Sequence, residues 1–204
     1  MIPAAILAAG ASSRMGRPKA LLPTGVVGEI FLTRIIRTLS EVPVDDLLVV
    51  TGKDSLAIRT AVEGAGMTLQ LIENPDPGEG QLSSLLTALR VIDHPGVRAM
   101  LVTLVDVPLV STETVRSVIN AYRYSGAPVV RPAWRGRHGH PVIFDRSVFG
   151  ELRNADPQLG AKAVIRAYET AIVDVEVHDQ GAFLDIDTQA DYDRLIKQLP
   201  PSAD

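Results

Sequence analysis

Short apolar runs alternate with stretches of helical periodicity along most of the chain. The apolar runs are typical of strands buried on both faces, and the stretches between them place apolar residues three or four positions apart. Strands are therefore predicted at residues 4–9, 46–52, 67–73 and 99–108, and helices at 29–40, 54–63 and 82–91. Strands that alternate with such helices favour right-handed crossovers. We expect a Rossmann-like α/β fold with a mainly parallel mixed sheet flanked by helices.

The rhythm changes after residue 126. The segment "APVVRPAWRGRHGHPVIF" predicts two extended runs around a turn rich in Gly, Arg and His, which is a hairpin-like insertion near residues 128–145. Beyond it, a helix is predicted at residues 158–169, a strand at 171–177 and a last helix at 189–198. Because the chain has no internal repeat, low-complexity tract or linker, residues 1–204 are predicted to form one domain.

Composition and charge exclude several classes of function. The formal net charge of −4 gives no general attraction for nucleic acid, and the absence of cysteine excludes disulfides, thiolate metal sites and a catalytic thiol. The amino-terminal segment "MIPAAILAAG" has no basic stretch, and its apolar run is too short to span a bilayer. We expect a cytoplasmic protein that binds neither nucleic acid nor a membrane.

The segment "ILAAGASSRMGRPK" predicts an anion-binding loop. A simple connection from strand to helix needs roughly two to six residues, and this one is longer. Its small residues let backbone N–H groups approach an anion; they are Gly10, Ala11, Ser12 and Ser13. Arg14 adds a planar fork for phosphate oxygens and Lys19 a compact charge, which together suit a triphosphate. The spacing matches neither the P-loop nor the dinucleotide fingerprint, and a flexible connection with solvated cations is the alternative.

Two acidic segments are candidates for a magnesium site, because magnesium prefers oxygen ligands. Asp106 closes the most apolar strand, where a charge is costly without a partner, although a turn or a helix cap is the alternative. Asp185 and Asp187 alternate with apolar residues, so on a strand both carboxylates face one side. Thr188 and Asp191 are predicted to form the capping box of the last helix.

The loop segment resembles the signature of the MobA-like nucleotidyltransferases, which is Leu-Ala-Ala/Gly-Gly-x-Ser-x-Arg-Met-Gly-x-x-Lys. The matching residues are Leu7, Ala8, Ala9, Gly10, Ser12, Arg14, Met15, Gly16 and Lys19. Alanine at Ala9 resembles the molybdenum cofactor cytidylyltransferase branch rather than the guanylyltransferase branch. Family-like segments follow as Asp-x-Pro at 106–108, Gly-His-Pro at 139–141 and Asp-Ile-Asp-Thr at 185–188.

This resemblance implies a fold of the nucleotide-diphospho-sugar transferase type and assigns roles to residues. It implies Mg²⁺ at Asp106 and Asp187, with Asp185 as a helper, and catalytic roles for Arg14, Lys19 and Asp106. The implied nucleotide-binding residues are Leu7, Ala8, Ala9, Gly10, Ala11, Ser12, Ser13, Arg14, Lys19, Asn74, Gly80, Ser84 and Asp106. For Asn74, Gly80 and Ser84, a loop followed by a helix cap is the structural alternative.

The residues that the resemblance implies for acceptor binding have weaker sequence signals than the nucleotide-binding residues. The implied residues are Arg135, His140 and Asp185, and the hairpin also carries Arg131, Arg137 and His138. This basic cluster suits an anionic acceptor, or it is a solvated loop with scattered charge. The segment "DPQLGAK" at 156–162 resembles the family's Gly-Asp-x-Gly-Ala-Arg, with different spacing of its Asp and Gly.

The predicted function is magnesium-dependent nucleotidyl transfer. CMP from CTP is moved to a phosphate-bearing acceptor, molybdopterin or molybdenum cofactor, and pyrophosphate is released. Handover of the product to a molybdenum enzyme is a further expectation. Two alternatives stay open, namely a sugar- or polyol-phosphate nucleotidyltransferase of the same fold and a nucleotide-binding cofactor chaperone without turnover. Nucleotide identity, acceptor identity and oligomeric state do not follow from the sequence.

Overall fold

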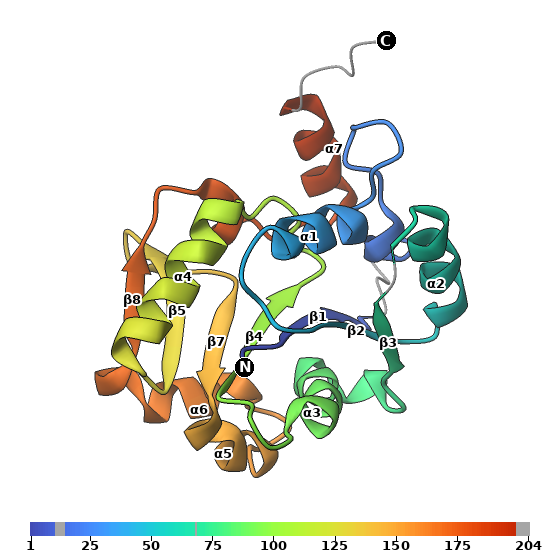
Figure 1. Cartoon of the computed structure of the whole chain (residues 1–204). Helices are drawn as coiled ribbons and strands as arrows, with labels where there is room; N and C mark the ends of the chain where they lie inside the picture. The colour runs from blue at the N-terminus through green and yellow to red at the C-terminus, as the bar shows by residue number, and fades with distance from the viewer. Residues whose placement is uncertain (11–14, 68, 199–204) are drawn as a thin grey trace.

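A mixed β-sheet forms the centre of the molecule (Figure 1). The computed structural model describes residues 1–10, 15–67 and 69–198. Within these residues the strand order is β3 (Gln70–Glu73), β2 (Leu47–Thr51), β1 (Ala4–Ala8), β4 (Ala99–Leu104), β7 (Val142–Asp145), β5 (Val129–Trp134) and β6 (Arg137–His138), and β8 (Val173–Glu176) also pairs with β5. The expected α/β fold with a mixed sheet is therefore confirmed.

The parallel part of the sheet places four strand ends at one edge. β1 pairs in parallel with β2 and β4, and β2 pairs in parallel with β3. β7 is antiparallel to β4, with Val142 opposite Val102, so the residues just before β7 lie at the same edge. The predicted hairpin near 128–145 is present as β5 and β6, and it is built into the main sheet because β7 continues from it. We refer to this edge as the carboxyl edge.

Helices cover both faces of the sheet (Figure 1). One face packs against α1 (Phe31–Ser40), α2 (Ser55–Gly64) and α4 (Thr112–Ser125). The other packs against α3 (Gln81–Ile92), α5 (Phe149–Arg153) and α6 (Ala161–Ala167). Residues along β1 alternate between the two cores, Ile6 toward the α1 side and Leu7 toward the α3 side, as the period of two in a strand requires. No helix in the described ranges is long and apolar enough to cross a membrane.

The last helix closes a third, smaller core. α7 (Gln189–Gln198) packs through Tyr192 against Phe31, with ring centroids 6.0 Å apart, and the Tyr192 hydroxyl donates to the Pro23 carbonyl at 3.0 Å. The predicted capping box is confirmed, because the Thr188 N–H donates to Asp191 at 2.9 Å and the Asp191 N–H to the Thr188 hydroxyl at 3.2 Å. α7 thus covers the segment that follows the anion-binding loop.

Three predictions differ from the structure, and one short helix was not predicted. The strand predicted at 99–108 ends at Leu104, because the chain turns before Asp106. The helix predicted at 158–169 is shorter, and α5 was missed because so short a helix shows too little periodicity. Residues 184–188 are irregular rather than a strand. The remaining short 3-10 helices are η1 (Lys19–Leu21), η2 (Pro77–Glu79), η3 (Arg146–Val148), η4 (Glu169–Ala171) and η5 (Gln180–Phe183).

Candidate active site

A lysine joins two carboxylates at the carboxyl edge. Lys19, the first residue of η1, places its Nζ 3.1 Å from Asp106 Oδ2 and 2.6 Å from Asp187 Oδ1. The Lys19 side chain is only 12% exposed, against 23% for Asp106 and 42% for Asp187. Burial weakens the screening by water, so this ion-pair triad interacts more strongly than surface pairs do. Three residues predicted from separate motifs therefore meet at one point.

Asp106 keeps part of its carboxylate uncommitted. It lies just beyond β4, and its Oδ1 atom is buried without a hydrogen-bond partner among the described residues. A buried carboxylate oxygen without a partner costs free energy, so such an atom marks a place for a ligand. Asp106 lies in a turn and is partly buried, and no described helix begins at it, so of the two structural alternatives only the helix cap is not what the structure shows.

Asp187 reaches the site through backbone contacts rather than through a strand. The Ile186 N–H donates to the Asp106 carbonyl at 2.8 Å, and the Ile186 side chain is fully buried. The strand on which the alternation was predicted is absent, and an irregular segment is fixed instead against the chain just beyond β4. Burial raises the pKa of Asp185, and the negative charges of Asp106 and Asp187 raise it further, so Asp185 shares the same electrostatic environment.

Two glycines permit the close approach of this carboxyl-terminal segment. A Cβ at Gly181 would lie 2.1 Å from the Leu109 carbonyl oxygen, and a Cβ at Gly139 would lie 2.1 Å from the Ala182 carbonyl oxygen. These separations are far below any van der Waals contact, so only glycine fits without a shift of the backbone. The contact is sealed by the His140 N–H, which donates to the Ala182 carbonyl at 2.9 Å.

The anion-binding loop is described only at its two ends. Ala11, Ser12, Ser13 and Arg14 lie outside the described residues, and their predicted contacts with phosphate remain predictions. At the start of the loop, a Cβ on Gly52 would lie 2.8 Å from the Ala9 carbonyl oxygen, so β2 ends against the loop backbone. The loop begins at the carboxyl edge, as the sequence predicts.

The predicted base-binding segment is held by its own side chains. Asn74 is buried, and its Nδ2 donates to Ser83 Oγ at 2.8 Å and to Ser84 Oγ at 3.1 Å. The structure therefore gives Asn74 and Ser84 a role in fixing the start of α3, and a contact with base or ribose stays a prediction. Gly80 has φ +82°, a conformation that favours glycine, immediately before α3.

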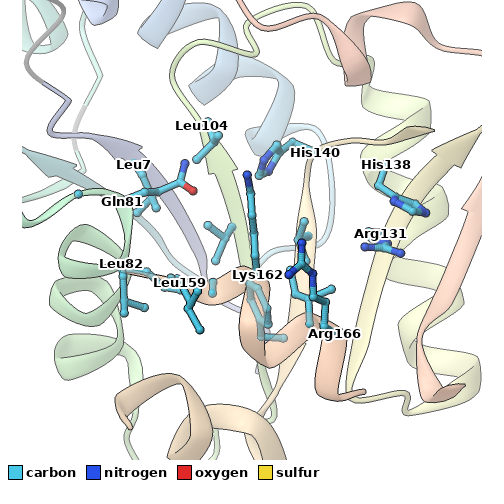
Figure 2. Close-up of a pocket in the computed structure, with 18 of the residues that line it drawn as sticks. Leu7, Gln81, Leu82, Leu104, Arg131, His138, His140, Leu159, Lys162 and Arg166 are labelled. Atoms are coloured by element: carbon cyan, nitrogen blue, oxygen red, sulfur yellow. The ribbon is translucent and has the colours of Figure 1, made fainter. Parts of the chain in front are cut away.

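A cavity of about 660 Å³ lies beside the triad on the α3 side of the sheet (Figure 2). Its floor is apolar and comes from β1, β4 and β7, through Leu7, Val102 and Val142. Its walls come from α3, with Gln81 and Leu82, and from the segment leading into α6. Leu7 and Gly80 of the predicted nucleotide set lie in this lining, as does His140 of the predicted acceptor set. The cavity thus joins the two sides of the predicted reaction. We call it the basic pocket because several basic side chains line it.

Basic side chains face the basic pocket, and no carboxylate is among the described residues that line it. They are Arg131, His138, His140, Lys162 and Arg166. Arg131 Nε is 2.7 Å from Asp174 Oδ1, and His138 Nε2 is 3.4 Å from Asp174 Oδ2, so these two share one counter-charge. Burial lowers the pKa of His140, and the opposing effects of the Val102 backbone and Asp106 do not offset it, so its imidazole is neutral at pH 7.

Arg135 does not belong to the basic pocket. It stands at the tip of the β5–β6 hairpin with φ 49° and is exposed, and it is absent from the described lining. Its guanidinium lies 4.7 Å from the centroid of the Trp134 ring. Arg135 follows β5 in the turn at the hairpin tip, whereas Arg131 lies within β5 and lines the cavity. The predicted acceptor role of Arg135 is therefore not supported.

The carboxylates fit a divalent cation of the magnesium type. Asp106 and Asp187 already contact a single cationic atom, and Asp106 Oδ1 has no other described partner. The described ranges contain no group of three or more His, Asp or Glu side chains arranged to hold a metal. Magnesium is commonly bound by one or two carboxylates together with substrate phosphates and water, so two suffice when a nucleotide is present.

Sequence reasoning missed the residues whose role depends on long-range packing. Gly52 and Gly181 carried no signal beyond their residue type, and their importance comes from backbone atoms far away in sequence. Lys162 and Arg166 lie one helical turn apart on α6, a spacing that places both on one face. The family resemblance placed the segment 156–162 on the acceptor side, but it singled out neither Lys162 nor Arg166.

Comparisons with known proteins agree with this geometry. A model of the MobA-like NTP transferase domain matches residues 4–172. The probable molybdenum cofactor guanylyltransferase of Carboxydothermus hydrogenoformans is 28% identical over 203 residues, covering 95% of this chain and 94% of that protein. The crystal structure of Rv0371c from Mycobacterium tuberculosis H37Rv superposes with a TM-score of 0.82 at 28% identity, covering 98% of this chain and 100% of that one.

A second solved structure and the name of the Carboxydothermus relative bear on the metal ion and the nucleotide. Rv0371C of Mycobacterium tuberculosis H37Rv in complex with manganese matches with a TM-score of 0.74 at 27% identity, over 97% of this chain and 99% of that one. The bacterial relative is named for a guanosine nucleotide, which differs from the cytidylyltransferase branch expected from Ala9. Because the family model spans most of the chain and the fold agrees over nearly all of it, the chain belongs to the MobA-like NTP transferase family and is a nucleotidyltransferase.

Proposed function

We propose that this nucleotidyltransferase moves a nucleoside monophosphate onto a phosphate-bearing acceptor of the molybdopterin type. The observation that carries the proposal is the triad of Lys19, Asp106 and Asp187 at the carboxyl edge, next to a pocket lined by basic side chains. The triad provides ligands for a cation and a charge for nucleotide phosphates, whereas the pocket attracts an anion. The name of the Carboxydothermus relative supports an acceptor from molybdenum cofactor synthesis.

In the proposed reaction, an oxygen of the acceptor phosphate attacks the α-phosphorus of the nucleoside triphosphate. A new phosphorus–oxygen bond forms, the bond from the α-phosphorus to the bridging oxygen breaks, and pyrophosphate carries the electron pair away. The acceptor phosphate is already ionised near neutral pH, so no general base is needed. His140, whose imidazole is kept neutral by burial, is therefore not needed as a general base for such an acceptor.

Magnesium is part of the proposal. Asp106 and Asp187 would hold Mg²⁺, and the manganese complex of the relative Rv0371C supports a divalent ion in this family member. When bound, the ion supplies positive charge that neutralises nucleotide phosphate oxygens. Lys19 contacts both carboxylates and adds a second positive charge at the same point. Catalysis then consists of positioning and electrostatic stabilisation, since the charge to be stabilised lies on phosphate oxygens.

For the nucleotide we propose CTP, on the resemblance carried by Ala9. GTP is the second candidate, and it is favoured by the guanylyltransferase name of the relative. The start of the loop packs tightly, with Gly52 against the Ala9 carbonyl, so this residue is fixed in position. Replacing Ala9 with Gly is therefore a direct way to ask whether this position influences the choice of base.

The decisive experiment is a matrix of nucleotides and acceptors with released pyrophosphate as the readout. CTP, GTP and ATP are each combined with molybdopterin, a sugar phosphate and a polyol phosphate, with and without Mg²⁺. Pyrophosphate released with molybdopterin and only in the presence of Mg²⁺ is the expected result. Release only with sugar or polyol phosphates would replace the acceptor, and nucleotide binding without any release would indicate a cofactor chaperone.

A further inference from the structure

A folded-back loop, residues 22–31, directly follows the short helix that carries Lys19. The Leu22 N–H donates to the Lys19 carbonyl at 3.0 Å, and the Phe31 N–H donates to the Leu22 carbonyl at 2.8 Å. The two ends of the loop are also joined by an isolated antiparallel bridge. The tip gains little from packing, because Val27 is 83% exposed. The position of the loop, and of Lys19 before it, therefore depends on the base of the loop.

The base of the 22–31 loop connects the three members of the triad. Leu22 and Phe31 are fully buried in the third core, which also contains Ile186. Ile186 precedes Asp187 in the chain, and its N–H donates to the Asp106 carbonyl at 2.8 Å. The loop also lies beside α7, the helix that follows the second carboxylate (Figure 1). A shift of the loop base would therefore move the lysine relative to both carboxylates of the triad.

A buried carboxylate fastens this loop to α1. The Glu29 side chain is only 3% exposed. It accepts a hydrogen bond from Thr24 Oγ1 at 2.6 Å, and it contacts Arg34 Nη1 at 3.1 Å and Arg37 Nη1 at 2.6 Å. Burial alone would raise the pKa of Glu29, but the hydrogen bonds from Thr24 and Arg34 and the charges of both arginines lower it. The carboxylate is therefore ionised at pH 7.

Stabilisation alone does not explain a charge at this position. Burying a carboxylate costs free energy, and apolar residues of similar volume often stabilise a protein as well as a buried ion pair does. Hydrogen bonds to a carboxylate are directed, which apolar packing is not. Those of Glu29 join the loop, through Thr24, to two arginines on one face of α1. The network thus fixes one position of the loop on the helix.

We propose that Glu29 is a positioning residue for catalysis, which clamps the 22–31 loop to α1 and thereby sets the place of Lys19 between Asp106 and Asp187. Glu29 acts through the loop backbone and the third core, and not by contact with a substrate. A misplacement of about 1 Å costs roughly a hundredfold in rate, so even a small shift of the loop is measurable. The activity readout rests on the proposed function, whereas the structural link from Glu29 to the triad does not depend on it.

A second carboxylate between two arginines provides a matched control. Asp93 lies near the start of β4, at the opposite edge of the sheet, with Arg146 Nη2 2.7 Å from its Oδ1 and Arg153 as a further ion-pair partner. Its side chain is 16% exposed. Glu29→Gln and Asp93→Asn each replace a largely buried carboxylate with the amide of the same shape. Both unfolding midpoints should therefore fall by a similar amount, about 5–10 °C.

Pyrophosphate release with CTP, molybdopterin and Mg²⁺ separates a positioning role from a merely structural one. The kcat of Glu29→Gln should fall about tenfold or more, whereas that of Asp93→Asn should stay within about twofold of the wild type. The acceptor KM of both variants should also stay within about twofold, because the basic pocket lies on the α3 side of the sheet. Equal losses of kcat in the two variants, or wild-type kcat in Glu29→Gln, would overturn the proposal.

A milder variant covers the case in which Glu29→Gln does not fold. Thr24→Val keeps the carboxylate and both arginines and removes only the hydroxyl that donates to Glu29. Its kcat should fall about threefold or more, as the loss of one hydrogen bond to a charged group allows, with an unchanged acceptor KM. Wild-type kcat in this variant would contradict the clamp.

Hydrogen exchange tests the structural link without any enzyme activity. The amides of Phe31 and Ile186 report on the loop base and on the contact with Asp106. Both should exchange about tenfold faster or more in Glu29→Gln than in Asp93→Asn, and the similar global stability of the two variants makes such a difference local. Equal exchange in the two variants would contradict the link. The expected exchange difference in a protein that releases no pyrophosphate would contradict only the proposed function.

Discussion

The two sides of the carboxyl edge differ in the charged side chains that they present among the described residues. On the α1 side, Lys19 lies between Asp106 and Asp187. On the α3 side, the basic pocket has Lys162 and Arg166 without an acidic partner among the described residues that line it. Carboxylates suit a divalent ion, and cations suit a phosphate. Under the proposed function, the first group would serve the metal ion and the second an anionic substrate.

The two sides also differ in how they are built. The acidic side depends on backbone packing between distant segments, with Gly181 against Leu109 and Ile186 hydrogen-bonded to Asp106. The basic pocket takes Lys162 and Arg166, both exposed, from one short helix, α6. We therefore expect substitutions on the acidic side to affect both folding and catalysis. Substitutions in the pocket should affect acceptor affinity alone.

The largest effect is expected from Asp106→Ala. This change removes the carboxylate whose Oδ1 atom is buried and unpartnered in the described structure, and it takes away one of the two carboxylates that contact Lys19 there. Magnesium-dependent pyrophosphate release should fall below detection, by about a thousandfold or more, which corresponds to about 4 kcal/mol. Asp46→Ala, an exposed aspartate at the opposite edge, is the control and should retain wild-type activity. Unchanged pyrophosphate release by Asp106→Ala would show that Asp106 is not needed to bind the cation.

Lys19→Ala should have the next largest effect. A unit charge at ~4 Å is worth about 4 kcal/mol at the dielectric near a protein surface, and part of this stabilises the nucleotide phosphates. The rate with CTP or GTP should fall at least tenfold, each factor of ten being about 1.36 kcal/mol. Steady-state pyrophosphate release measures this rate. Near-normal turnover with CTP, GTP and ATP would exclude a central role for Lys19.

Gly181→Ala tests the backbone contact that positions Asp187. Its Cβ would lie 2.1 Å from the Leu109 carbonyl oxygen, so one of the two segments must shift. We expect destabilisation of about 1–3 kcal/mol, as for overpacked cores, together with reduced activity. Gly150→Ala is the matched control, because nothing lies within 4 Å of its Cβ. A variant with normal activity and an unchanged unfolding midpoint would show that Asp187 is positioned by other contacts.

Arg135→Gln should have the smallest effect. Arg135 lies at the hairpin tip over Trp134, outside the described pocket lining. The acceptor KM should change by less than about twofold, since an exposed cation–π contact is worth only about 0.5–1 kcal/mol. The same assay on Lys162→Gln gives the contrast. A loss with Arg135→Gln as large as that with Lys162→Gln would move the acceptor toward the hairpin and break the comparison of the two sides.

Much of the fold and the centre of the site was predicted from local patterns. The alternation of apolar runs predicted β1 to β4 and the helices between them, and the capping box of Thr188 and Asp191 was predicted from spacing alone. Lys19, Asp106 and Asp187 were predicted from separate motifs, and the structure brings them together. The boundaries were less accurate, because a strand ends where its hydrogen-bond partners end rather than where its apolar residues do.

The sequence by itself determined which residues have the chemistry for phosphate and metal binding, since residue type and spacing are local properties. Only the tertiary structure decided that Arg131 rather than Arg135 faces the pocket, and that Lys162 and Arg166 face it from another element. It also decided that Gly139 and Gly181 must be glycine. The physical reason is that a cavity, like a close backbone contact, is formed by atoms that lie far apart in the chain. The positions of these atoms follow from strand order and packing, and no local sequence pattern contains that information.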